Sequence, residues 1–214
     1  MNDDFFLDTY DSGVGSTIVF THGWTDNRNA WDGVITNLND HARCIAWSIR
    51  GHGESFAPPP GQYTRDHTLS DLKVITQRSK EKVILAGHSL GGYLSLAHSL
   101  LYPEDVEALI LVGAGPGFRK KESIDQWNSS VIESAKKLDL PEGSEATALH
   151  TDAWVIDSLS EIKVPTLVIV GEHDKRFRAS MSVFEKYLNV KTSVVVEDAA
   201  VSYTHLTLPT TMWV

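Results

Sequence analysis

Residues 82–102 read KVILAGHSLGGYLSLAHSLLY, and this stretch decides the fold. An apolar run leads directly into a serine flanked by glycines, and apolar residues at helical spacing follow. The pattern predicts a buried strand, a sharp turn at Ser89 and an amphipathic helix that ends before Pro103. Such a turn has no room for side chains two positions before and after the serine, which accounts for Gly87 and Gly91. The serine hydroxyl is then presented to solvent beside the N-terminus of a helix.

The same kind of apolar run recurs along the chain and predicts further strands at 16–23, 43–51, 106–114, 165–172 and 191–198. Their apolar character is continuous, which is typical of strands covered on both faces. One more candidate strand, FFLDTY, precedes them at 5–10. Helical patterns at 68–80 and 178–189 fall between the runs. Strands that alternate with helices predict an α/β fold with a doubly wound, mainly parallel sheet.

Residues 115–163 are the exception, because they contain no good strand. Two helical patterns, at 122–140 and 150–159, lie within them. We therefore expect a single domain over 1–214, in which 115–163 form a helical lid insertion over one end of the sheet. Trp127 and Trp154 are candidates for the walls of a pocket there, and ordinary packing within the lid explains them equally well.

Composition narrows the function classes. The chain has 214 residues, 42% of them hydrophobic, and a formal net charge of −9, which disfavours nucleic acid or an anionic membrane as a partner. The single cysteine, Cys44, has no partner for an internal disulfide and predicts a buried thiol in a reducing compartment, the cytoplasm. The beginning of the chain, MNDDFFLDTY, shows no signal peptide.

Four segments in order, FTHGW (20–24), IRGHGES (49–55), GHSLGG (87–92) and GEHD (171–174), give the chain its resemblance to a known family. It resembles the α/β-hydrolases of the lipase and esterase-like group. The resemblance implies that Ser89 is a nucleophile and that the backbone N–H groups of Trp24 and Leu90 bind the oxyanion. It also implies that His22 and His52 are structural.

The acid that would orient a catalytic histidine lies in GEHD, which ends a predicted strand and so reaches the sheet edge that holds Ser89. The resemblance implies Asp174, with Glu172 as the alternative. In the family's order of serine, acid and histidine, His205 is the only histidine after Asp174 and is therefore the candidate base.

The tail disagrees with the family pattern. Val201 stands where relatives carry the histidine, and LTLPTTMWV, interrupted by Pro209, makes a poor helix. Residues 201–214 resemble foreign sequence joined to the frame, and a divergent native terminus is the other explanation. We therefore expect this exact chain to be nearly inactive as an enzyme.

Two functions remain. The first is a serine hydrolase of small carboxylic esters or related acyl compounds, which works through an acyl-enzyme and needs no cofactor. The second is a pocket-binding protein or inactive fragment without a working histidine. Carbon–carbon bond and peroxide chemistry also occur on this fold, whereas a serine nucleophile argues against epoxide and haloalkane chemistry. No pair of histidines has the spacing of a zinc site with a third ligand nearby.

Overall fold

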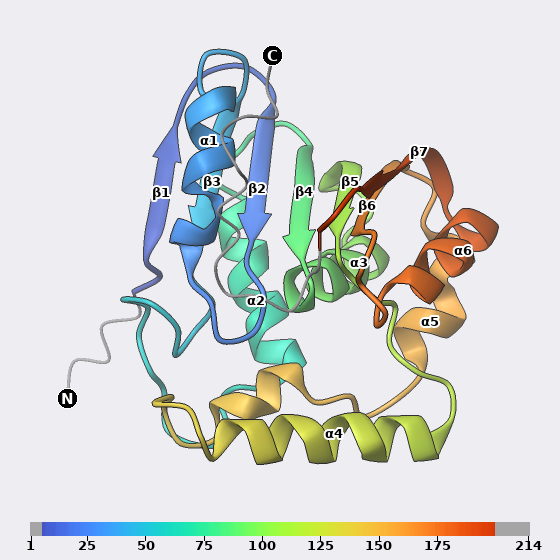
Figure 1. Ribbon diagram of the computed structural model, residues 1–214. Coiled ribbons are helices and arrows are strands. Elements are labelled where there is room, and N and C mark those ends of the chain that lie inside the picture. The colour runs from blue at the N-terminus through green and yellow to red at the C-terminus, as the bar shows by residue number, and fades with distance from the viewer. Residues whose placement is uncertain (1–5, 200–214) are drawn as a thin grey trace.

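A computed structural model describes residues 6–199. They form one seven-stranded sheet in the order β1-β3-β2-β4-β5-β6-β7 (Figure 1). β1 is antiparallel to β3, and every other neighbouring pair is parallel. The predicted α/β fold with a mainly parallel sheet is confirmed. The strands are β1 (Thr9–Ser12), β2 (Thr17–Thr21), β3 (Arg43–Trp47), β4 (Val83–His88), β5 (Val106–Val112), β6 (Pro165–Gly171) and β7 (Asn189–Val196).

Helices cover the two faces unequally. α2 (Arg65–Thr76), α3 (Leu90–Leu101) and α6 (Arg178–Tyr187) contribute to the larger core, and α1 (Asp32–Leu38) to the smaller one. The sequence did not predict α1, because it is seven residues long and buries only Ile35. A 3₁₀ turn, η1 (Arg28–Trp31), leads into it.

The two cores lie on opposite faces of the sheet. In the larger one, Trp47 is fully buried and its indole Nε1–H donates a hydrogen bond of 2.9 Å to the Thr21 hydroxyl. In the smaller one, the rings of Phe20 and Trp31 lie 5.1 Å apart. Cys44 is buried here in β3, as predicted, and burial raises the pKa of its thiol.

Two predictions about the outermost strands of the sheet, β7 and β1, are wrong in part. β7 is not covered on both faces. Among residues 6–199 it pairs with β6 alone, and Val194 and Val195 remain 39% and 40% exposed. β-Branched residues favour a strand whether or not it is buried, so this run indicated a strand correctly but did not indicate burial. FFLDTY overlaps β1 only at Thr9 and Tyr10, since the antiparallel pairing runs from Thr9 to Ser12.

The segment without a predicted strand is helical in the described structure, as expected. It contains α4 (Lys121–Ala135), η2 (Ser144–Ala148), α5 (Trp154–Ser158) and η3 (Leu159–Glu161). α4 runs across the end of the sheet to which the arrows of β2 and β4 point (Figure 1). The Trp127 indole donates a hydrogen bond to the Ala148 carbonyl at 2.8 Å, which ties α4 to η2. Within residues 6–199, no helix combines the length and apolar character needed to cross a membrane.

A buried ion pair holds the loop after β3 to α2. Arg50 donates to both carboxylate oxygens of Asp71, at 2.6 and 2.7 Å, and both side chains are almost fully buried. Removing one member of such a pair leaves an uncompensated buried charge. We expect Asp71→Asn to lower the free energy of unfolding by about 3–5 kcal/mol in urea denaturation followed by circular dichroism.

The matched control is Asp157→Asn, which breaks a pair of equal length, 2.6 Å to Arg119, on the surface. Because water screens both groups there, this variant should unfold at the wild-type midpoint. Equal losses in the two variants would contradict the expected dependence on burial.

Candidate active site

Ser89 occupies the turn between β4 and α3 in a conformation that few residues adopt. Its φ is 50° and its ψ is −112°. The Ser89 N–H donates to the Val112 carbonyl of β5 at 3.0 Å, and its hydroxyl has no hydrogen-bond partner among residues 6–199. Strain of this kind persists only where surrounding packing enforces it, and it concentrates at functional sites.

Three glycines make the turn possible. A Cβ on Gly87 would lie 2.3 Å from the backbone of Gly91, and a Cβ on Gly91 would lie 2.1 Å from the carbonyl oxygen of Thr21. The predicted need for glycine at both positions is confirmed. Gly92 is a third such position, since its Cβ would lie 2.4 Å from that of Ala114. The sequence analysis missed it, although the Gly-Gly doublet was a signal.

The loop after β2 lies against the serine. A Cβ built on Gly23 would be 3.4 Å from the Cβ of Ser89, so the adjacent Trp24 backbone is close to the turn. Neither the Trp24 N–H nor the Leu90 N–H has a hydrogen-bond partner among the described residues. Leu90 is the first residue of α3, where an N–H has no acceptor within the helix. Two backbone donors beside Ser89 are therefore unoccupied.

His22 supports this loop with both ring nitrogens. Its Nε2 accepts from the Ile49 N–H at 2.9 Å, so the proton is on Nδ1, which donates to the Gly23 carbonyl at 2.6 Å. Burial, and then the neighbouring His52, lower the pKa of His22 to about 3. A neutral ring whose nitrogens are both engaged cannot accept a proton from Ser89. Burial also lowers the pKa of His52, whose ring lies 5.3 Å from that of His22.

Asp174 lies just after β6 and is only 5% exposed. One carboxylate oxygen, Oδ1, accepts from the N–H groups of Arg176 and Phe177 at 3.0 and 2.9 Å. The other, Oδ2, is buried and has no partner among residues 6–199. Leaving a buried acceptor unpaired costs free energy, so this oxygen is a place for a donor. Glu172, by contrast, is exposed and accepts the Asp198 N–H at 3.1 Å.

The described histidine next to Ser89 is His88, whose Nε2 is buried and has no partner among residues 6–199. Burial lowers its pKa, and the negative charges of Asp26 and Asp174 oppose that effect. The field of Asp174 therefore reaches the turn that carries Ser89. The candidate base His205 lies outside the described residues, and no histidine within 6–199 hydrogen-bonds to Asp174.

One group in the described chain has metal-ligand spacing. Ligand atoms of Glu172, His173 and Asp198 lie within 4.8 Å of one another, and all three residues are exposed. Exposed groups of this kind are common without an ion, and no buried ligand supports them, so we assign no metal to this cluster.

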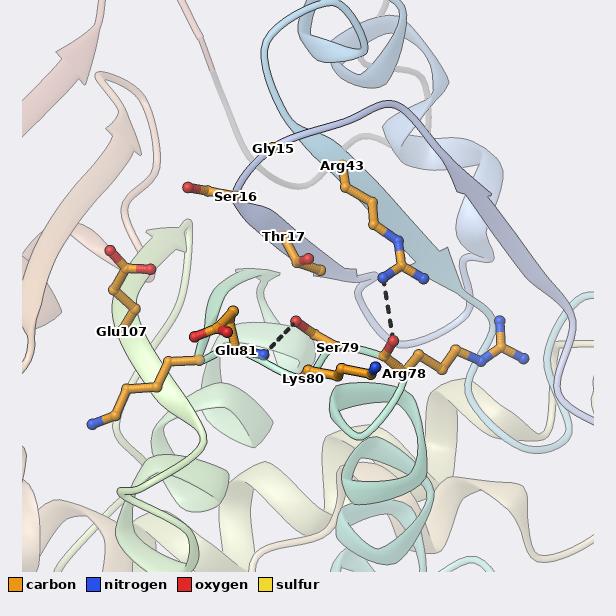
Figure 2. A pocket seen from close by; sticks show the side chains of 10 residues that line it. Gly15, Ser16, Thr17, Arg43, Arg78, Ser79, Lys80, Glu81 and Glu107 are labelled. Atoms are coloured by element: carbon orange, nitrogen blue, oxygen red, sulfur yellow. Dashed lines mark hydrogen bonds between the residues drawn. The ribbon is translucent and has the colours of Figure 1, made fainter.

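A large surface hollow of about 610 Å³ lies far from this chemistry (Figure 2). Thr17, Arg43 and Glu107 line it at the amino ends of β2, β3 and β5, the edge opposite to Ser89. Arg43 donates there to the Arg78 carbonyl and makes two hydrogen bonds to Asp11, so its charge is already compensated. The hollow contributes nothing to the site around Ser89.

Comparisons with known proteins identify the family of the chain. The sequence profile of the alpha/beta hydrolase fold matches residues 16–141, which is more than half of the chain. The protein belongs to the α/β-hydrolase family. This α/β-hydrolase is 33% identical over 173 residues to the 2-hydroxymuconate semialdehyde hydrolase of Pseudomonas sp. (strain CF600), an alignment that covers 77% of the chain and 59% of the relative.

A second relative is the pimeloyl-[acyl-carrier protein] methyl ester esterase of Nitrosomonas europaea. It is 32% identical over 114 residues, which cover 51% of this chain and 42% of the esterase. The chain thus spans less than two thirds of the length of either relative.

Solved structures share the fold at lower identity. A thermophilic esterase from Thermogutta terrifontis superposes with a TM-score of 0.76 at 24% identity, covering 91% of this α/β-hydrolase and 86% of the esterase. A bromoperoxidase from Bacillus anthracis gives 0.76 at 21% identity, covering 91% of this chain and 88% of the peroxidase. Enzymes described by different reactions share this framework, so the framework does not fix the reaction.

The close packing around Gly91 can be tested by substitution. We expect Gly91→Ala to prevent native folding, because its Cβ would meet the backbone of β2, which cannot move aside. The control is Gly33→Ala on α1, where a Cβ meets nothing within 4 Å. That change should raise the free energy of unfolding by about 0.5–1 kcal/mol, the helix preference of alanine over glycine. A folded Gly91→Ala protein with the wild-type melting temperature would disprove the packing argument.

Acid should destabilise the protein through His22. Its pKa is near 6.5 in the unfolded chain and about 3 when folded, so below pH 6.5 protons bind the unfolded state preferentially. The contribution of His22 to the free energy of unfolding is therefore fully present above its unfolded pKa of about 6.5 and is lost as the pH falls toward 3. Between pH 7.5 and 5 this one residue should lower the free energy of unfolding by about 2 kcal/mol.

Urea titrations at the two pH values measure this loss, and His22→Gln should reduce it by that amount. His67→Gln is the control, because His67 is exposed on α2 and should leave the difference unchanged. A His22→Gln protein with the wild-type pH dependence would show that His22 is not held neutral.

Proposed function

We propose that this α/β-hydrolase is a serine hydrolase that cleaves small carboxylic esters or related acyl compounds through an acyl-enzyme. The observation that carries the proposal is the strained Ser89, at a φ of 50° between β4 and α3, with its hydroxyl unengaged by the described residues. The named activities of the two relatives, hydrolase and methyl ester esterase, favour the same class of reaction.

Each residue has one role in the proposed reaction. The Ser89 oxygen attacks the carbonyl carbon while a histidine removes its proton, and the N–H groups of Trp24 and Leu90 stabilise the oxyanion. Oδ2 of Asp174 accepts the other ring N–H of that histidine and fixes its tautomer. The histidine then protonates the leaving alcohol, and water hydrolyses the acyl-enzyme. By chain order the histidine is His205, or one that a tail of the family's usual kind supplies at position 201.

The proposal extends to the lid, the lack of a cofactor, the kind of substrate and the location in the cell. Residues 115–163 act as a lid over the site, with Trp127 and Trp154 on its inner side. The reaction needs no cofactor, because serine, histidine and carboxylate suffice for acyl transfer. The net charge of −9 and the buried Cys44 thiol favour a small-molecule substrate and a cytoplasmic location over nucleic acid or a membrane.

A second candidate function is a pocket-binding protein without catalysis. The observation that favours it is the unpaired, buried Oδ2 of Asp174, which no histidine among residues 6–199 reaches. The same sheet edge would then bind an acyl compound without turning it over.

Labelling and turnover separate the two functions. We expect a fluorophosphonate to label Ser89 and Ser89→Ala to abolish the label, in a chimera whose residues 201–214 are replaced by a relative's terminal segment that begins with histidine. In that chimera, Asp174→Asn should lower turnover of a 4-nitrophenyl ester on the order of 10³–10⁴-fold, since the wrong tautomer is then favoured. Glu172→Gln, at the exposed carboxylate, is the matched control and should keep at least half of the turnover.

The chain as given should be nearly inactive, and His205→Ala should change its activity little. An active 214-residue chain that loses turnover in His205→Ala would instead identify His205 as the base. A folded chimera with neither label nor turnover would favour the binding protein.

A further inference from the structure

Arg176 lies in the loop after β6, two residues beyond Asp174, and contacts both Asp174 and helix α4. Its backbone N–H donates to Oδ1 of Asp174 at 3.0 Å. Its guanidinium carbon lies 5.2 Å from the ring centroid of Trp127 on α4. One residue thus contacts both the proposed catalytic acid and the proposed lid.

The charge of Arg176 is not neutralised. Other arginines on this side of the sheet have carboxylate partners: Arg65 donates twice to Asp152, at 2.9 and 2.8 Å, and Arg119 pairs with Asp157 at 2.6 Å. Among residues 6–199, Arg176 has no such partner, and its side chain contacts an aromatic face instead. A guanidinium stacked on a ring keeps its N–H edges available for a planar, bidentate acceptor.

Two further cations lie close to Arg176 in sequence. Lys175 and Arg178 also lack carboxylate partners in the described structure, in a chain of net charge −9. Asp174 is the anion closest to them in sequence, and two backbone N–H groups already engage one of its oxygens. The exposed carboxylates of Glu172 and Asp198 lie at the same loop, so the binding of an anion here depends on Arg176 itself.

A cluster of aromatic rings adjoins the free guanidinium, with Phe118 and Trp127 half-buried and His150 and Tyr93 buried behind them. The ring of Trp127 lies 5.6 Å from that of Phe118 and 5.8 Å from that of His150, which is itself buried against Tyr93 at 4.6 Å. Tyr93 is one turn along α3 from Ser89, and its N–H donates to the Ser89 carbonyl. A row of aromatic rings thus leads from the first turn of α3 to the cation.

We propose that Arg176 determines substrate specificity by binding a carboxylate at the far end of the acyl chain, while the methylene groups between lie along the half-buried rings of Phe118 and Trp127. The substrate class is therefore an ester of a dicarboxylic acid with one acid group free. This inference rests on the proposed function, because it takes Ser89 as the position of the scissile carbonyl.

Binding to a protein that cannot form the acyl-enzyme tests the inference separately from catalysis. In the Ser89→Ala protein, isothermal titration calorimetry compares 4-nitrophenyl hydrogen adipate with its uncharged methyl ester, methyl 4-nitrophenyl adipate. We expect the anion to bind at least tenfold more tightly, and 500 mM KCl to remove most of that preference by screening.

The variant Arg176→Gln, added to Ser89→Ala, should bind both esters equally and keep the affinity for the uncharged one. Arg178→Gln removes a nearby cation of the same kind and should keep the preference within twofold. Equal binding of the two esters by Ser89→Ala would overturn the inference, and so would a preference that survives in Arg176→Gln. An equal loss in Arg178→Gln would also overturn it, because a general positive field would then replace a specific contact. None of these binding outcomes changes the labelling or turnover expected of the chimera. The proposed function is therefore tested independently of this inference.

Discussion

The close approach of α3 to β2 and β4 is the constraint on which the rest of the structure depends. At Gly87 and Gly91 the backbones pass so near each other that a single methyl group would overlap a neighbouring main-chain atom. That contact accompanies the positive φ of Ser89, and both the Ser89 hydroxyl and the Leu90 N–H are without a hydrogen-bond partner among residues 6–199. The loop that carries Trp24 packs against the same turn through Gly23. The conformation of the proposed nucleophile, the position of the proposed oxyanion donors and the packing of the helix therefore have one steric cause.

Much of this could be predicted from the sequence, because the strands are short and apolar and the turn has a specific glycine pattern. The errors follow from interactions that a linear pattern does not contain. β7 reads as a buried strand, but burial depends on what packs over it, and Val194 and Val195 are exposed at the edge. α1 was missed because its single buried residue, Ile35, gives no periodicity.

The candidate site shows the same division. Ser89 and Asp174 follow strands whose ends can be predicted, and a parallel sheet brings such ends to one edge. The unpaired Oδ2 of Asp174 could not be predicted, since it depends on which backbone N–H groups the following turn presents. Nor could the position of Arg176 over Trp127, which joins residues 49 positions apart through the placement of a helix. Contacts between insertion and sheet have no signature in either segment alone.

The uneven distribution of packing has a consequence for how this protein can change. At Gly87 and Gly91, where no added atom fits, a substitution disrupts the backbone packing that shapes the turn. On α4 the only buried residue is Val131, and Trp127 packs against the core from the same helix, so most other side chains of α4 add little to the core. Substitutions can therefore accumulate along this one helix while the protein stays folded, and any specificity that α4 gives to the proposed site can change with them.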